Sequence, residues 1–234
     1  MKNILEIAAF SPEAAIIAAN AGADRIELCS AYAEGGLTPS LSAMEFVKQN
    51  VRIPVFIMIR PRGGDFVYSE IEKAVMKQDI LHAKNTGADG IVLGVLTKEN
   101  HVDELLLKEL VHLCSPLPVT FHRAFDLCPD PFEAMETLIR CGVKRILTSG
   151  QKATAEKGGG TIAALHEKAN GKIILMPGAG ISPANIFALM KKTGCAEFHA
   201  SAKSPGTPAG VFGFGENILP DAAIIAELKK KISL

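Results

Sequence analysis

The feature that most constrains the fold is a series of eight short apolar segments separated by stretches with helical spacing. Each segment is nearly continuously apolar and rich in β-branched residues, which is typical of a parallel strand covered on both faces. The segments are residues 3–9, 25–30, 54–60, 90–96, 118–124, 145–149, 172–178 and 197–202. Eight such strands alternating with helices predict an α/β protein of the closed (β/α)₈ type, a TIM barrel.

The connecting stretches carry signals for helix starts and ends. Three of them open with a cap residue followed by proline, with Ser11, Asp130 and Ser182 as the expected caps. Four of them end in glycine shortly before the next strand, at Gly22, Gly87, Gly142 and Gly194. An open, doubly wound sheet is the alternative fold. It is disfavoured because the first strand runs into AFSPEA, at residues 9–14, and not into a G-x-G-x-x-G turn.

The chain length suits one domain. With 234 residues, 48% of them hydrophobic and 21% charged, the chain can bury a full core, and we predict a single barrel domain over residues 1–234. Residues 203–220 form a long glycine-containing connection before a final helical stretch. Its length predicts a flap over the barrel mouth or an oligomer contact, with Phe212 and Phe214 as anchors.

Composition excludes several classes of partner. Acidic and basic residues balance at 25 each, so net charge gives no reason to expect a nucleic acid or a membrane surface. No stretch approaches the ~18 apolar residues of a membrane span, and the first residues do not resemble a signal peptide. The five cysteines are scattered and form no C-x-x-C pair, which argues against a disulfide framework and a zinc site. We therefore expect a cytoplasmic protein.

Alternation along the strands gathers polar side chains at one end of the predicted barrel. The carboxyl ends of the strands and the loops after them form the active face of such barrels. Counting every second residue places the following polar side chains on inward faces near that end: Glu6, Glu27, Arg60, His122, Ser149, His199 and Ser201. Because buried charges need partners, Glu27 is predicted to pair with Arg60 on the neighbouring strand.

Loops after the strands add further candidate ligand-binding residues. After the third strand, Gly63-Gly64 allows close approach of the backbone, and Asp65 is expected to fold back on Arg60 or Arg62. The loop after the fifth strand supplies Arg123 and Asp126. Small residues around Gly178 and Gly180, before the helix start expected at Ser182, and the glycines at 158–160 suggest a cradle for a phosphate or carboxylate.

Several of these segments strongly resemble the CutC family, which is named for copper homeostasis. The resemblance is carried by residues 26–40, 56–69, 119–126, 146–150, 176–181 and 197–202, and the phrases RPRGGDF and HRAFD are its most specific parts. It implies a cytoplasmic TIM barrel, often described as copper-binding and often oligomeric. It does not imply a particular reaction.

Two functions of different classes remain open at this point. The first is Cu(I) binding, since thiolate and imidazole are ligands that Cu(I) prefers. Cys29, His122 and His199 are the candidate ligands, whereas Met58 and Met176 on the same faces are ordinarily packing residues.

The second function is that of a barrel enzyme acting on a small anionic, sugar-like substrate. Glu27 would be the acid or base, His122 its proton partner, and Arg60 with Arg123 the clamp for the anion. The remaining polar candidates would contact the substrate, namely Glu6, Arg62, Asp65, Asp126, Ser149, Gly178, Gly180, His199 and Ser201. The sequence leaves open whether the protein is an enzyme. A homo-oligomer is implied by the family resemblance, and an oligomer contact is one of the two alternatives for residues 203–220.

Overall fold

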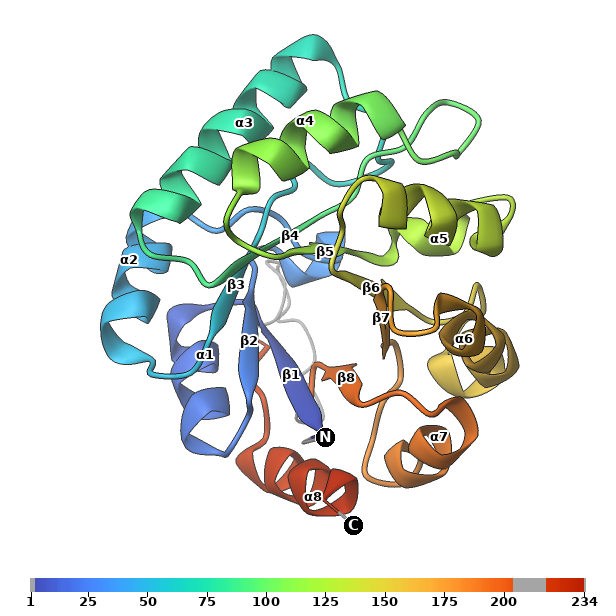
Figure 1. Ribbon diagram of the computed structural model, residues 1–234. Helices are drawn as coiled ribbons and strands as arrows, with labels where there is room; N and C mark the ends of the chain where they lie inside the picture. Colours follow the sequence, from blue (N-terminus) through green and yellow to red (C-terminus); the bar gives the residue numbers. More distant parts are fainter. Residues whose placement is uncertain (1–2, 204–217, 234) are drawn as a thin grey trace, which may run out of the picture.

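The protein folds as a TIM barrel, as the sequence predicts. The computed structural model describes residues 3–203 and 218–233. In this part of the chain eight parallel strands alternate with helices, and the helices lie outside the strands (Figure 1). The strands are β1 (Ile4–Ala9), β2 (Arg25–Leu28), β3 (Val55–Met58), β4 (Gly90–Leu93), β5 (Val119–Phe121), β6 (Arg145–Thr148), β7 (Ile174–Pro177) and β8 (Glu197–Ala200).

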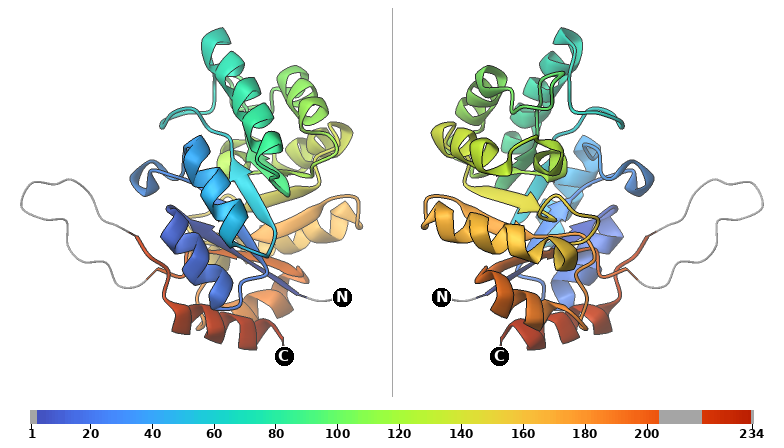
Figure 2. Two further views of the ribbon diagram at one scale, coloured as in Figure 1. Left: turned by 90° about the vertical axis from the view of Figure 1, so that its left-hand side faces the viewer. Right: turned by 90° about the vertical axis from the view of Figure 1, so that its right-hand side faces the viewer.

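Helices cover the outer face of the barrel. They are α1 (Pro12–Asn20), α2 (Leu41–Asn50), α3 (Glu70–Asn85), α4 (Glu104–Cys114), α5 (Pro131–Arg140), α6 (Ala155–Ala169), α7 (Ile186–Thr193) and α8 (Ala222–Ile232). Two short 3₁₀ helices, η1 (Tyr32–Glu34) and η2 (Arg123–Leu127), follow β2 and β5 at the carboxyl end of the strands. The last helix, α8, packs beside α1 and against β1, so it completes the ring of helices (Figure 2).

The strand order is β7-β6-β5-β4-β3-β2-β1-β8, so the first strand lies between the second and the last. Register places Glu6 of β1 beside Arg25 of β2 and beside His199 of β8. Three polar residues from three strands therefore lie at one level inside the barrel. Between β7 and β8 the described residues form no hydrogen-bonded ladder, and the barrel has a seam there.

The helix caps follow the sequence signals with one exception. Ser11 and Asp130 accept hydrogen bonds from the first-turn N–H groups of α1 and α5, as expected. The four predicted terminal glycines all have positive φ. The helix start predicted at Ser182 is wrong, because α7 begins at Ile186 and Ser182 lies in the preceding turn, where its N–H bonds to Asn185 Oδ1.

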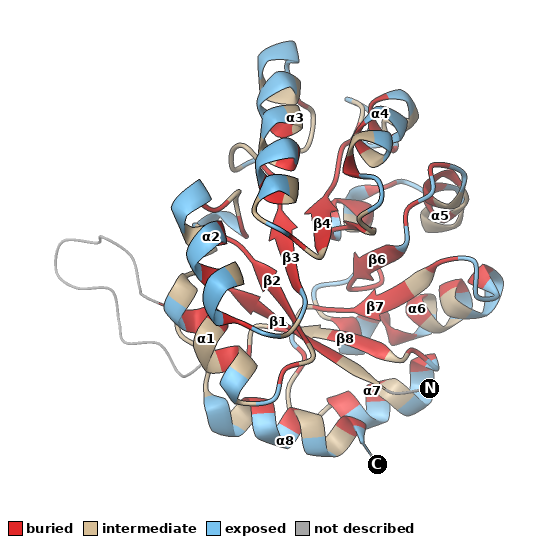
Figure 3. Ribbon diagram, turned by 60° about the vertical axis from the view of Figure 1, so that its left-hand side comes forward, coloured by how far each residue is buried: buried red, intermediate tan, exposed pale blue. Residues whose placement is uncertain are grey.

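The main core lies between the strands and the helices. Outward-facing strand residues such as Leu5, Ile7, Ile26 and Ile57 are fully buried against the inner faces of the helices. Figure 3 shows the same division, with buried strands at the centre and exposed positions on the outer faces of the helices. The other face of each strand points into the barrel, and this face carries the polar groups described below.

The predicted long connection lies largely outside the described residues. Lys203 forms an isolated bridge with Pro220, and residues 204–217, with Phe212 and Phe214, are not described. Among the helices that the structure describes, none is both long enough and apolar enough to cross a membrane.

Candidate functional site

A cavity of about 540 Å³ opens at the carboxyl ends of the strands. Glu27, Arg60, His122 and His199 all line it, and these residues come from or directly follow β2, β3, β5 and β8. Its apolar wall is formed mainly by Phe10, Tyr32, Met58, Phe66, Leu147 and Ile181. Both the volume and the mixture of an apolar wall with a few polar groups are typical of a site for a small molecule.

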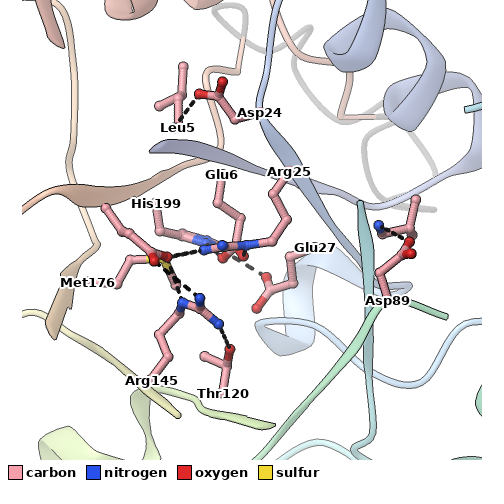
Figure 4. A network of polar contacts seen from close by, with 12 residues as sticks. Leu5, Glu6, Asp24, Arg25, Glu27, Asp89, Thr120, Arg145, Met176 and His199 are labelled. Atoms are coloured by element: carbon pink, nitrogen blue, oxygen red, sulfur yellow. Dashed lines mark hydrogen bonds and ion pairs between the residues drawn. The ribbon is translucent and has the colours of Figure 1, made fainter. Parts of the chain in front are cut away.

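A charged layer lies inside the barrel, one level nearer the amino ends of the strands (Figure 4). Arg25 donates to both Glu6 and Glu197, with 2.6 Å between its Nη2 and Glu197 Oε2. Arg145 Nε donates to the same Glu197 oxygen at 2.6 Å. Both guanidinium groups also lie over the ring of Phe56, at 4.8 and 5.4 Å from its centroid. This layer forms the floor beneath the cavity and satisfies the charges that lie there.

Arg25 and Arg145 are not among the site residues predicted from the sequence, although the sequence carries a signal for both. Arg25 lies two residues before Glu27, and Arg145 lies two residues before the inward-facing Leu147. The same alternation would have found them. Glu6, predicted to contact a ligand, belongs to this layer instead, because it is fully buried, pairs with Arg25 and His199, and is not among the cavity-lining residues.

Glu6, His199 and Glu27 form a line of three titratable groups that leads from the charged layer into the cavity. His199 Nδ1 lies 2.8 Å from Glu6 Oε1, and its Nε2 lies 3.7 Å from Glu27 Oε2. Burial would raise the pKa of Glu6, but the Arg25 charge and the His199 hydrogen bond outweigh it and lower the pKa to about 2. Burial also lowers the pKa of His199, yet the carboxylates of Glu27 and Glu6 together raise it above its usual value.

Glu27 is the least satisfied carboxyl group of the site. Its side chain is buried, and burial raises its pKa, with a smaller raising effect from Glu6 and a lowering effect from His199. Oε2 is 3.5 Å from the Cys29 thiol, which donates to it, whereas the buried Oε1 has no hydrogen-bond partner among the described residues. A buried carboxyl group whose pKa is raised keeps its proton to a higher pH than a free glutamate does, which suits a group that takes up and returns a proton.

His122 is a neutral imidazole whose tautomer follows from one contact. Its Nδ1 accepts a hydrogen bond from the Ala124 N–H at 3.1 Å, so the ring proton is on Nε2. Burial, aided by the positive charge of Arg60, lowers the pKa of His122 to about 3. Nε2 is buried and forms no hydrogen bond in the part of the chain that the structure describes. His122 can therefore donate a hydrogen bond, but it has no free lone pair with which to act as a base.

The predicted Glu27–Arg60 ion pair is absent among the contacts of the described residues. Arg60 instead donates to three backbone carbonyls, those of Glu34, Gly36 and Gly64, with 3.1 Å to Gly36 and 2.8 Å to Gly64. Its guanidinium group also lies over the Phe66 ring at 4.8 Å. These bonds tie the loops after β2 and β3 to the cavity wall. The buried Nε of Arg60 has no hydrogen-bond partner among the residues that the structure describes.

Arg62 and Asp65 close the loop after β3 on itself. Arg62 Nη2 donates to Asp65 Oδ1 at 2.9 Å and Arg62 Nε donates to Glu72 at 2.6 Å, so Asp65 folds back on Arg62, one of its two predicted partners. Neither residue is among those that line the cavity. The structure thus separates them from the other candidate ligand-binding residues.

Asp126 organises the loops after β5 and β6. Its carboxylate accepts hydrogen bonds from Thr148, from the N–H and hydroxyl groups of Ser149, from the Gln151 N–H and from Arg123 Nε. Arg123 Nη2 also donates to Ser149 Oγ at 3.1 Å. Ser149 is fully buried and does not line the cavity, whereas Arg123, about half exposed, does. Asp126 and Ser149 therefore hold Arg123 at the rim.

The two glycine-rich segments have different roles. Gly180 and Ser201 line the cavity, and Gly178 lies just behind it, where a Cβ atom would come within 2.4 Å of Leu147. The glycines at 158–160 are part of α6 and do not form the predicted loop. A Cβ atom on Gly158 would lie 1.9 Å from the Ser149 carbonyl oxygen, so this glycine lets α6 pack closely on the end of β6.

The predicted Cu(I) ligands do not converge. Within the part of the chain that the structure describes, the group of acidic, cysteine or histidine residues whose ligand atoms all lie within 4.8 Å of one another is Glu6, Glu27 and His199. Cys29 and His122 are not in it. Burial, aided by the charge of Glu27, raises the pKa of the Cys29 thiol well above its usual value, which opposes formation of the thiolate that a soft metal needs.

Comparison with known proteins identifies the family. The CutC family model matches residues 3–204. The chain belongs to the CutC family. The human relative named copper homeostasis protein cutC homolog is 52% identical over 201 residues, which is 86% of this chain and 74% of the relative. The CutC family protein of Chromobacterium violaceum is 46% identical and covers 87% of this chain and 82% of its own length.

Solved structures agree with this assignment. The crystal structure of a CutC protein from Streptococcus agalactiae is 34% identical, has a TM-score of 0.82 and covers 85% of this chain and 98% of its own. A phosphoribosylanthranilate isomerase from Thermotoga maritima also matches, with a TM-score of 0.61, 13% identity and coverage of 100% and 99%. At that identity the match shows the shared barrel fold alone.

Proposed function

We propose that this CutC-family protein is an enzyme that transfers a proton on a small anionic substrate. The observation that carries the proposal is a set of three buried polar atoms that have no hydrogen-bond partner within residues 3–203 and 218–233. They are Glu27 Oε1, His122 Nε2 and Arg60 Nε, on side chains that line one cavity. Buried polar groups are nearly always hydrogen-bonded. Three exceptions in one cavity are best explained by a ligand that supplies the missing partners.

Glu27 is the proposed acid and base. Its buried Oε1 is free to take a proton from a carbon atom of the substrate, and its raised pKa favours return of that proton in the next step. The neighbouring His199 is held by Glu6 through Nδ1, so its Nε2 stays directed toward Glu27. The pKa values of Glu27 and His199 are raised and that of Glu6 is lowered, so Glu6 is the carboxylate of the three that stays ionised most readily.

His122 is the proposed electrophile. When a C–H bond next to a carbonyl group breaks, the electron pair moves into a C=C bond and negative charge develops on the carbonyl oxygen. The Nε2–H group of neutral His122 can donate a hydrogen bond to that oxygen, because its Nδ1 is already occupied by Ala124. A neutral donor keeps its proton while it stabilises the charge, which suits a reversible transfer.

Exchange of substrate hydrogen for deuterium tests this proposal. The protein would be incubated in D₂O with a panel of small phosphorylated and carboxylated keto compounds, and loss of C–H signals would be followed by proton NMR. We expect exchange with at least one compound, and Glu27→Gln should abolish it. Glu45→Gln, an exposed change on α2, is the matched control. If Glu27→Gln exchanged as fast as wild type, Glu27 would not be the base.

Copper binding is the second candidate function, and one observation favours it. The Cys29 Sγ and Met58 Cε atoms both approach Gly36, to 3.3 and 3.6 Å from the position that a Cβ atom would take there. Both residues belong to one small buried cluster at the cavity wall. Thiolate and thioether sulfur are ligands that Cu(I) prefers. The chain is also similar to proteins named for copper homeostasis, which favours copper binding as well.

Titration with Cu(I) against a competing chelator, under reducing conditions, tests this candidate. Binding by Cys29 and Met58 predicts that Cys29→Ser abolishes it, whereas Cys141→Ser, at the end of α5, leaves it unchanged. Equal affinity in Cys29→Ser and wild type would refute it. The two functions are separable, because Glu27→Gln keeps both sulfur atoms.

A cytoplasmic location and a homo-oligomer remain parts of the proposal. All five cysteines are free, which supports a reducing compartment. Exposed apolar side chains on α3 and α4, with Ile71 79% and Leu105 84% exposed, support contact with a second copy. Light scattering of wild type and of an Ile71→Glu, Leu105→Glu variant would test the assembly, and identical masses would exclude this face.

A further inference from the structure

One loop of the cavity carries backbone N–H groups that form no hydrogen bond with the other described residues. This loop, here called the β7 loop, is residues 178–182 between β7 and α7, and its Ala179, Gly180 and Ile181 line the cavity. None of the hydrogen bonds formed by the described residues uses the N–H group of any of these three. Gly178, by contrast, donates to the Thr148 carbonyl at 2.9 Å.

The carbonyl groups of the β7 loop fix the direction of these donors. The Ala179 carbonyl accepts from the Ala155 N–H, at the start of α6, at 3.0 Å. The Gly180 carbonyl accepts from Asn185 Nδ2 at 2.8 Å. Because the C=O and the following N–H of a trans peptide point in opposite directions, the N–H groups of Gly180 and Ile181 face away from the surrounding helices. Both residues line the cavity, so these donors lie at its wall.

The backbone conformation of the β7 loop is unusual at two consecutive residues. Ala179 and Gly180 have φ values of 75° and 76°, so two consecutive residues are in the left-handed region. That conformation is costly for alanine and persists because its carbonyl is held by α6. Successive N–H groups in such turns form concave sites for anions.

Two side chains complete the site from other elements. Ser201, directly after β8, lines the cavity, and neither its hydroxyl nor its N–H group takes part in a hydrogen bond among the described residues. Arg123, after β5, is fixed by Asp126 and Ser149 through Nε and Nη2, and its Nη1 forms no hydrogen bond with another described residue. One guanidinium, one hydroxyl and a row of backbone donors thus border one cavity.

We propose that the β7 loop, with Ser201 and Arg123, binds the phosphoryl group of a phosphate monoester. Three oxygen atoms at tetrahedral angles match donors arriving from separate loops, whereas a carboxylate offers only two. The inference deepens the proposed function, since it names the anionic part of the substrate on which the Glu27 chemistry would act. It rests on the proposed function in one respect, that the bound phosphoryl group positions the substrate for the Glu27 chemistry.

Titration of ¹⁵N-labelled protein with inorganic phosphate, at constant ionic strength, tests the site directly. Hydrogen bonds from the β7 loop should shift the amide protons of Gly180 and Ile181 downfield, along a saturable curve. Arg123→Met and Ser201→Ala should each weaken phosphate binding about tenfold, the scale of one hydrogen bond to a charged group. Arg140→Met, which removes a comparably exposed and ion-paired arginine far from the cavity, is the control.

The outcomes separate this inference from the proposed enzyme. Absence of a saturable shift at Gly180 and Ile181, or equal phosphate affinity in Arg123→Met and wild type, would overturn the phosphoryl site. Acetate binding as tightly as phosphate would overturn the monoester class in favour of a carboxylate. Glu27→Gln should bind phosphate as wild type does. If this variant loses hydrogen exchange but keeps phosphate binding, the loss is due to the missing base and not to the phosphoryl site.

Discussion

Glu197→Gln should remove much of the stability that the charged layer gives the barrel. Glu197 is 9% exposed, and its Oε2 atom accepts from Arg25 and from Arg145, each at 2.6 Å. Its Oε1 accepts from Arg145 Nη2 at 3.1 Å. Glutamine has nearly the same shape, so the substitution changes charge and hydrogen bonding without opening a cavity.

The size of the loss in the free energy of unfolding follows from the contacts that Arg25 and Arg145 keep in the variant. Arg25 retains its ion pair with Glu6, whereas Arg145 loses its one carboxylate partner among the described residues and keeps only the Thr120 hydroxyl. Removing one member of a buried ion pair costs about 3–5 kcal/mol. Glutamine still offers one acceptor oxygen, so we expect the free energy of unfolding to fall by about 3 kcal/mol, near the lower end of that range.

Urea unfolding at neutral pH, followed by circular dichroism, measures this change. Glu104→Gln is the matched control, because Glu104 forms ion pairs with Arg140 and Lys108 on the surface, where solvent screens them. The control should unfold with nearly the wild-type midpoint. If Glu197→Gln were as stable as Glu104→Gln, the charged layer would contribute no net stability and the reasoning would fail.

Three further predictions concern acid stability and loop packing. Stability should fall as the pH drops from about 4.5 to about 2, because the pKa of buried Glu6 is lowered by its ion pair from 4.5 to about 2 on folding; a constant urea midpoint over this range would contradict this. Asp126→Asn should lower the free energy of unfolding by about 2 kcal/mol and speed amide exchange at Ser149; unchanged exchange would count against it. Gly158→Ala should lower the melting temperature, since its Cβ atom meets a carbonyl oxygen, whereas Gly160→Ala, in open space, should raise it.

The strand pattern predicted the barrel and one end of its interior. Alternation alone placed Glu27, His122 and His199 on inward faces, because a strand offers only two faces and the period is two. The structure brings all three to one cavity. The same rule, applied two residues earlier on two strands, would also have found Arg25 and Arg145.

Partners within loops could not be predicted in this way. Arg60 was expected to pair with a carboxylate, but it bonds to carbonyls of two loops, whose positions depend on loop conformation and not on strand period. The roles of Asp126 and Arg62 depend on loop geometry in the same way. The start of α7 differed because Asn185, and not Ser182, supplies the polar side chain of that turn.

The seam between β7 and β8 has a mechanical consequence. Backbone hydrogen bonds join all the neighbouring pairs of strands except β7 and β8 among the described residues. The Arg145–Glu197 ion pair reaches past this seam, from β6 to β8. Side-chain contacts stretch and re-form more readily than a ladder of peptide bonds. The wall between the β7 loop and Ser201 therefore depends on side-chain contacts and not on a backbone ladder among the described residues. A hinge at that place would let a ligand enter without disturbing the strands that carry Glu27 and His122.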